Sequence, residues 1–116
     1  DLLSMVPPEV QGTAVVLLHG LCSTPDELLT VQSALRSRGY SVHPLVIEGY
    51  SFDAGAPLQH AAPYERWIDA VQAQVKALRA QHDRVMLVGI SAGSSLALGA
   101  AIRCGDDVEA WKSCAI

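Results

Sequence analysis

Two nearly continuous apolar runs constrain the fold of this 116-residue chain more than any other feature. The first covers residues 14–18, and the second covers residues 84–89, which are apolar through their centre. Strands that are buried on both faces, as in a parallel sheet, carry such runs, whereas half-exposed strands alternate apolar and polar residues. Because segments of helical periodicity follow each run, the sequence predicts βαβ units, an α/β fold and a doubly wound, mostly parallel sheet.

The segment between the two runs is expected to hold a helix, a strand and a long connection. A helix is predicted over residues 25–38, since Thr24 is a typical N-cap, a proline follows it, and Glu27 is placed to close a capping box. A strand is predicted over residues 41–47, near an edge or with a bulge, because it contains a proline. The connection over residues 48–62 is long enough to indicate a functional loop.

Two further helices and one further strand complete the pattern. A helix that opens at Pro63 carries one apolar stripe, which we interpret as core packing. A helix of small residues is predicted over residues 94–102. Residues 108–116 are a weaker candidate for an edge strand, because Lys112 lies in their middle. Right-handed crossovers would give the strand order 2-1-3-4 across the sheet.

The composition favours a single soluble domain and argues against several functions. Twelve acidic and eight basic residues give a net charge of −4, which leaves no basic patch to bind a nucleic acid. No apolar stretch approaches the roughly 20 residues that span a bilayer, and no export signal is visible, so we expect a cytoplasmic protein without stable membrane insertion. Three cysteines with no Cys-x-x-Cys spacing indicate reduced thiols, and no cofactor or metal site is predicted.

Residues 89–93, Gly-Ile-Ser-Ala-Gly, match the pattern Gly-x-Ser-x-Gly and place Ser91 between a buried strand and a buried helix. The flanking glycines remove the Cβ atoms that would collide in a sharp turn, so the serine can adopt a strained conformation with its hydroxyl exposed. The following helix then directs the N–H of Ala92 at the place where a negative oxygen would form. We predict Ser91 as a nucleophile and Ala92 as an oxyanion donor; the competing interpretation is a closely packed turn without a nucleophile.

The sequence His19-Gly20-Leu21 follows the first apolar run. In the order 2-1-3-4 the first and third strands are neighbours, and their carboxyl ends flank the crevice where ligands bind in such sheets. Both motifs should therefore meet there, with the N–H of Leu21 as the second oxyanion donor. Removing one such donor typically costs about 3 kcal/mol of transition-state stabilisation, so the positions of these two backbone groups matter more than their side chains.

The two motifs, in this order of strands and helices, resemble the N-terminal part of the α/β-hydrolase superfamily, over residues 14–104. Three shorter motifs are similar to the bacterial carboxylesterase and monoacylglycerol lipase group: Val-Leu-Leu-His-Gly-Leu at 16–21, Arg-Gly-Tyr at 38–40 and His-Pro at 43–44. The resemblance implies a partial α/β-hydrolase fold and a serine hydrolase that acts on small-molecule carboxylic esters without a cofactor. It also implies Ser91 as the nucleophile and the backbone of Leu21 and Ala92 as the oxyanion hole.

The sequence departs from the family pattern in its histidines. In these enzymes the catalytic acid and histidine follow the nucleophile, whereas His19, His43, His60 and His82 all precede Ser91. His19 fits the structural histidine of the His-Gly motif, and only His60, in the long connection, is placed to approach the site as a base. Because a serine without a general base is a weak nucleophile, we expect the 116 residues to form one incomplete hydrolase domain with little or no activity.

Two other interpretations stay open. One is a non-catalytic remnant that binds a ligand or a partner protein, and the other is a phosphate-binding domain that uses the helix after Gly89, although it lacks the usual nucleotide motifs. Exposed sheet edges would favour self-association. Near the site, Tyr50, Phe52 and Leu58 are candidates either for an acyl pocket or for loop anchors, and Cys22 is interpreted as a packing residue.

Overall fold

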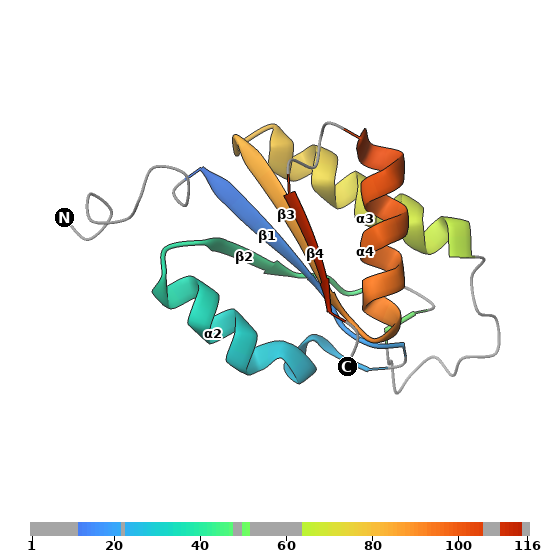
Figure 1. Ribbon diagram of the computed structural model, residues 1–116, viewed down its shortest axis with the longest axis horizontal. Helices are drawn as coiled ribbons and strands as arrows, with labels where there is room; N and C mark the ends of the chain where they lie inside the picture. The colour runs from blue at the N-terminus through green and yellow to red at the C-terminus, as the bar shows by residue number, and fades with distance from the viewer. Residues whose placement is uncertain (1–11, 22, 48–49, 52–63, 106–109, 115–116) are drawn as a thin grey trace.

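The computed structural model describes residues 12–21, 23–47, 50–51, 64–105 and 110–114 (Figure 1). These residues form four strands, three α-helices and one 3₁₀ helix. In chain order they are β1 (Thr13–Leu18), η2 (Pro25–Leu28), α2 (Leu29–Ser37), β2 (Ser41–Pro44), α3 (Tyr64–Arg79), β3 (Arg84–Ile90), α4 (Ala92–Cys104) and β4 (Ala110–Cys114).

The four described strands form one sheet in the order β2-β1-β3-β4, and every neighbouring pair is parallel. The α/β class, the parallel sheet and the strand order predicted from the sequence are confirmed, with β4 at an edge. β1 lies between β2 and β3, and all six of its residues are buried. The first crossover leads from β1 in one direction across the sheet and the second leads back past it, which places their helices on opposite faces.

Helices cover both faces of the sheet: α2 lies against one face, and α3 and α4 lie against the other (Figure 1). Ala14, Val16 and Leu18 of β1 belong to the core cluster beneath α3 and α4. Val15 and Leu17 point the opposite way, as alternate residues of a strand do, and belong to the cluster beneath α2. Burial on both faces explains why this strand has no polar residue between positions 14 and 18.

β3 is less evenly buried than its apolar sequence predicts. Val85 and Leu87 are fully buried on the face covered by α3 and α4. Met86, Val88 and Ile90 point to the other face and are only partly buried. The cause is the position of α2, which packs against β2 rather than β3.

Both helices on the second face bury residues against the sheet. In α3 the buried residues are Ile68, Val71, Val75 and Leu78, which confirms the interpretation of its stripe as core packing, except that Tyr64 at the start of the stripe is 44% exposed. The helix α4 begins at Ala92, two residues earlier than predicted, because the residue before it makes the turn out of β3. No helix in the described ranges combines the length and apolar character needed to cross a membrane.

The start of the first helix differs from the prediction in two ways. It opens as the 3₁₀ helix η2 and becomes α-helical only in α2. Thr24 caps it as expected, and its side-chain oxygen accepts the N–H of Asp26 at 3.3 Å. Glu27 does not close a capping box, however, because its carboxylate accepts the N–H of Gly20 at 2.8 Å instead.

The strand β2 ends at Pro44 rather than at residue 47. The N–H of Leu45 still donates to the carbonyl of Leu17 at 3.1 Å. The N–H of Ile47 then donates to the hydroxyl of Ser51 at 2.9 Å, so the backbone has exchanged its sheet partner for a side chain. The chain therefore leaves the sheet three residues earlier than its β-branched sequence predicts.

Candidate active site

Ser91 forms the turn between β3 and α4, at the carboxyl end of the sheet. Its backbone has φ 55° and ψ −125°, and among the described residues it is the only one other than glycine with a positive φ. An L-residue is strained in this conformation, which folds retain where surrounding packing enforces it and often where function uses it. The residue is exposed.

The glycines on either side of Ser91 allow close contact between backbones. A Cβ on Gly89 would lie 2.1 Å from the carbonyl oxygen of Gly93, and a Cβ on Gly93 would lie 2.2 Å from the carbonyl oxygen of Leu18. Distances this short require the backbone itself to move. The pattern Gly-x-Ser-x-Gly therefore corresponds to a turn packed directly on the end of β1.

The loop of residues 19–21, called here the His-Gly loop, lies beside this turn. β1 is paired with β3 along its full length, up to the pair Leu18 and Gly89, so the chain leaves the two strands at neighbouring points. A Cβ on Gly20 would lie 3.7 Å from the Cβ of Ser91. Leu21 is 50% exposed. The two motifs that the sequence predicted to converge do meet at the carboxyl end of the sheet.

Two backbone N–H groups in these loops are the candidate oxyanion donors. That of Ala92 belongs to the first turn of α4, where N–H groups have no acceptor inside the helix. The positive end of the helix dipole also favours a negative charge there. The second N–H belongs to Leu21 in the His-Gly loop. The structure brings Ser91, Leu21 and Ala92 to one end of the sheet, and their roles as nucleophile and donors stay predictions.

His19 is buried, and both of its ring nitrogens have hydrogen-bond partners. Nδ1 lies 2.6 Å from the carbonyl oxygen of Gly20, which can only accept, so Nδ1 carries the proton. Nε2 lies 2.6 Å from the hydroxyl of Ser51. Because that hydroxyl already accepts the N–H of Ile47, it can donate its own proton to Nε2. Both ring nitrogens are thus engaged with neighbouring segments, in agreement with the interpretation of His19 as the structural histidine of the His-Gly motif.

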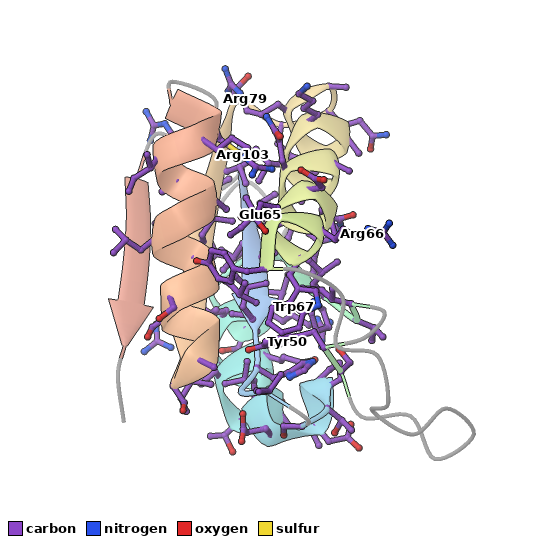
Figure 2. The ribbon with its side chains drawn as sticks, turned by 90° about the vertical axis from the view of Figure 1, so that its right-hand side faces the viewer. Tyr50, Glu65, Arg66, Trp67, Arg79 and Arg103 are labelled. Carbon is purple, nitrogen blue, oxygen red and sulfur yellow. The ribbon has the colours of Figure 1, made fainter. Side chains whose placement is uncertain are left out.

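Tyr50 holds the same loop from within the core. Its side chain is 1% exposed, its O–H donates to the carbonyl of His19 at 2.6 Å, and its ring lies beside Trp67 of α3 with the ring centroids 5.1 Å apart (Figure 2). Burial, reinforced by the charge of Glu27, raises the pKa of Tyr50 to about 12, so the O–H stays protonated. Of the two interpretations of Tyr50, the structure supports the loop anchor.

Sequence reasoning missed two side chains at this site, Glu27 and Ser51. For Glu27 the local pattern suggested a different partner, because a glutamate three residues after an N-cap usually closes a capping box. Ser51 lies 32 residues from its partner His19, and no sequence pattern pairs polar residues at that separation.

His43 and His82 form a separate cluster away from Ser91. Their ring centroids are 6.0 Å apart, and Nε2 of His43 lies 2.7 Å from the hydroxyl of Ser41. His82 precedes β3 and Ser91 follows it, so the length of the strand separates them. Burial, and then the charges of His82 and Arg36, lower the pKa of His43. Neither histidine is placed to serve Ser91 as a base.

Four candidate site residues lie outside the described residues, namely Cys22, Phe52, Leu58 and His60, as does Pro63, where a helix is predicted to open. Their predicted roles as packing residue, pocket or anchor residues and candidate base are therefore untested. Within the described part of the chain, no three His, Cys, Asp or Glu side chains are grouped so that they could hold a metal ion.

Comparisons with known proteins bear on the family and the fold. A family model described as "Serine aminopeptidase, S33" matches residues 10–115. A solved structure reported with LipS and LipT, two metagenome-derived lipolytic enzymes, is similar to the chain with a TM-score of 0.75 and 18% sequence identity. The match covers 93% of this chain and 46% of that one, so this chain spans about half the length of that structure. At such low identity the likeness shows the fold alone.

Proposed function

This chain belongs to the serine aminopeptidase S33 family of α/β-hydrolases, and from that premise we propose that it carries the nucleophile and oxyanion hole of a serine hydrolase acting on carboxylic esters. The observation that carries the proposal is the conformation of Ser91, an exposed serine held at φ 55° over the N-terminus of α4. Strain of this kind is retained where packing over-determines it, and glycine would relieve it without any change in the turn.

The proposed reaction is acyl transfer to Ser91 followed by hydrolysis. The Ser91 oxygen attacks the ester carbonyl while its proton moves to a base, and the carbonyl oxygen becomes an oxyanion that accepts the N–H groups of Leu21 and Ala92. The C–O bond to the alcohol then breaks as the base returns the proton to the leaving alcohol. Water next attacks the acyl-enzyme and releases the acid.

The base is the part of this chemistry that the sequence leaves open. No histidine follows Ser91 in the 116 residues, and His19 is already engaged with Gly20 and Ser51. In the chain-order pattern of these enzymes the acid and histidine come after the nucleophile. We therefore propose little or no turnover for this chain by itself, with the base supplied in the whole protein.

A rescue assay tests the proposal. Hydrolysis of a short-chain nitrophenyl ester is measured with and without added imidazole, which can serve as an external base. The expected result is an imidazole-dependent rate above that of imidazole in buffer, lost in Ser91→Ala and kept in Ser95→Ala. Ser95 is the matched control because it is another exposed serine, one turn further along α4. An aminoacyl nitroanilide is tested alongside the ester, so that the rates of amide and ester hydrolysis can be compared.

A rate enhancement that survives Ser91→Ala would contradict the assignment of the nucleophile. Strong turnover without imidazole that is lost in Ser91→Ala would contradict the missing base instead, and His60→Ala would then test the remaining candidate.

One alternative is favoured by the same absence of a later histidine. A non-catalytic member of the fold would keep the turn at Ser91 yet bind a ligand or a partner protein without reacting. No labelling of the chain by a fluorophosphonate, together with retained ester binding, supports that alternative.

The proposed cytoplasmic location is supported by the three cysteines, which have no spacing typical of metal or redox sites.

A further inference from the structure

We propose that Glu27 and Tyr50 are positioning residues that together orient the N–H of Leu21 toward Ser91, by holding the peptide bond between His19 and Gly20 at both ends. What that N–H does in a reaction rests on the proposed function. The fixed geometry of the two peptide planes does not, because it follows from four hydrogen bonds of the His-Gly loop.

The first peptide plane of the loop joins His19 to Gly20. Its carbonyl accepts the O–H of Tyr50 at 2.6 Å, and its N–H donates to Oε1 of Glu27 at 2.8 Å. In a planar trans peptide the C=O and N–H point in opposite directions. The two side chains therefore hold the plane from opposite sides, and any rotation of the plane lengthens both bonds.

The second peptide plane joins Gly20 to Leu21. Its carbonyl oxygen accepts Nδ1–H of His19 at 2.6 Å and the N–H of Ser23 at 3.1 Å. The N–H of Leu21 belongs to the same plane and must point the opposite way from that carbonyl. Fixing the carbonyl thus fixes the direction of the candidate oxyanion donor.

Gly20 joins the two planes, and its backbone is unusually free to rotate because it has no Cβ. A loop built on such a residue needs partners outside the backbone to fix its geometry. Glu27, from η2, and Tyr50, from the chain after β2, supply them for the first plane. The ring of His19, the residue whose carbonyl Tyr50 holds, supplies one for the second plane. The position of a Cβ on Gly20 is 3.4 Å from Oε1 of Glu27 and 3.7 Å from the Cβ of Ser91, so the loop is held close to Ser91.

The chemistry of the two partners suits this role. The Tyr50 side chain is buried and its pKa is raised to about 12, so it remains an O–H donor across the neutral range. Glu27 makes this bond instead of the capping-box bond that its position in the sequence predicts. A glutamate that served only to cap its own helix would accept N–H groups of that helix.

The test compares Glu27→Ala, Glu27→Gln and Tyr50→Phe by two measurements. One is the hydrogen-exchange rate of the Gly20 and Leu21 amides by NMR. The other is the rate at which a fluorophosphonate modifies Ser91 in the presence of imidazole. We expect Glu27→Ala to speed exchange of the Gly20 amide and to slow modification by about tenfold, since small misplacements of reacting groups have large effects on rate.

Two further expectations separate positioning from charge. Glu27→Gln should restore both quantities, because its amide oxygen still accepts the Gly20 N–H. Tyr50→Phe, which removes one oxygen and leaves the ring packed against Trp67, should reproduce the effects of Glu27→Ala. In the double variant the rate of Ser91 modification should fall by less than the product of the two single-variant factors, because both residues hold one peptide plane.

Matched controls are Asp26→Ala, which removes the same charge from the same short helix, and Tyr64→Phe, whose O–H donates to the carbonyl of Ser95 instead. Both should behave like the unsubstituted chain. Unchanged Gly20 exchange in Glu27→Ala overturns the inference, as does a Glu27→Gln variant as impaired as Glu27→Ala. If Ser91 is never modified while the amide results hold, the proposed function fails and the inferred orientation stands.

Discussion

Ser91 combines exposure, backbone strain and a position at the start of a helix, and this combination carries most of the functional argument. The strain has its own measurable consequence. An alanine at position 91 stays in the unfavourable conformation with φ 55°, whereas a glycine there is unstrained.

The first prediction concerns this strain. We expect Ser91→Gly to unfold with a free energy about 1 kcal/mol higher than that of Ser91→Ala, once the greater flexibility of glycine in the unfolded chain is subtracted. Urea unfolding of the two variants measures the difference. Equal stability, or a more stable Ser91→Ala, would mean that the turn is not strained. Neither variant should react with a fluorophosphonate at position 91.

The second prediction concerns the close contact at Gly93. A Cβ there would lie 2.2 Å from a backbone oxygen of β1, so we expect Gly93→Ala to lower the free energy of unfolding by about 2 kcal/mol. Gly99→Ala is the matched control on the same helix, because its Cβ would meet the side-chain ends of Tyr64 and Ile68, which can move. We expect that control to stay within about 1 kcal/mol of the unsubstituted chain, and similar losses in both would contradict the contact.

At the scale of secondary structure, the apolar pattern predicted the central elements well. The apolar runs of β1 and β3 correctly predicted two parallel strands, although one face of β3 is only partly buried, and the motif between β3 and α4 located Ser91. The hydrogen-bond partners of side chains at the helix starts were harder to predict. Glu27 bonds to Gly20 rather than to its own helix, because the His-Gly loop offers a nearer N–H that no local pattern reveals.

Interactions between distant segments explain the other differences. β2 ends early because Ser51 provides a hydroxyl for Ile47, and the partly buried face of β3 depends on where α2 packs. The network of His19, Ser51 and Tyr50 joins the chain after β1 to the chain after β2, through residues 31 and 32 positions apart in the sequence. Local patterns locate strands and helices, whereas these contacts depend on the assembled sheet.

The third prediction concerns the histidine cluster of His43, in β2, and His82, which follows α3. The pKa of His43 is lowered in the folded protein, mainly by burial and then by His82 and Arg36. The unfolded chain therefore binds a proton at His43 more readily, so stability is lost as the pH falls through the ordinary histidine value of about 6.5 toward the folded value.

Replacing His43 by glutamine should reduce that loss. Urea midpoints at neutral and mildly acidic pH should differ less in His43→Gln than in the unsubstituted chain. His82→Gln should also reduce the difference, but by less, since it removes only the second of the causes. An unchanged pH dependence in His43→Gln would contradict the assignment.

At the level of the whole molecule, the chain spans 46% of the length of the solved structure that it matches, and its described strands form one sheet with helices on both faces (Figure 1). In the described sheet β2 and β4 are the outer strands. Outer strands present unpaired backbone groups to other chains, so the predicted self-association belongs to this scale.

The fourth prediction is concentration-dependent association of the chain by itself. Sedimentation velocity should show the average mass rising with protein concentration, because exposed strand edges favour pairing between copies. A monomer at every concentration accessible to the experiment would show that the outer strands are protected.

The central claim, that Ser91 is the nucleophile, is tested most directly by mass spectrometry of the chain after incubation with a fluorophosphonate and imidazole. We expect one phosphonyl group per chain, located on Ser91 by peptide mapping, absent from Ser91→Ala and still present in Ser95→Ala. A phosphonyl group on any other residue, or none on the unsubstituted chain, would contradict it.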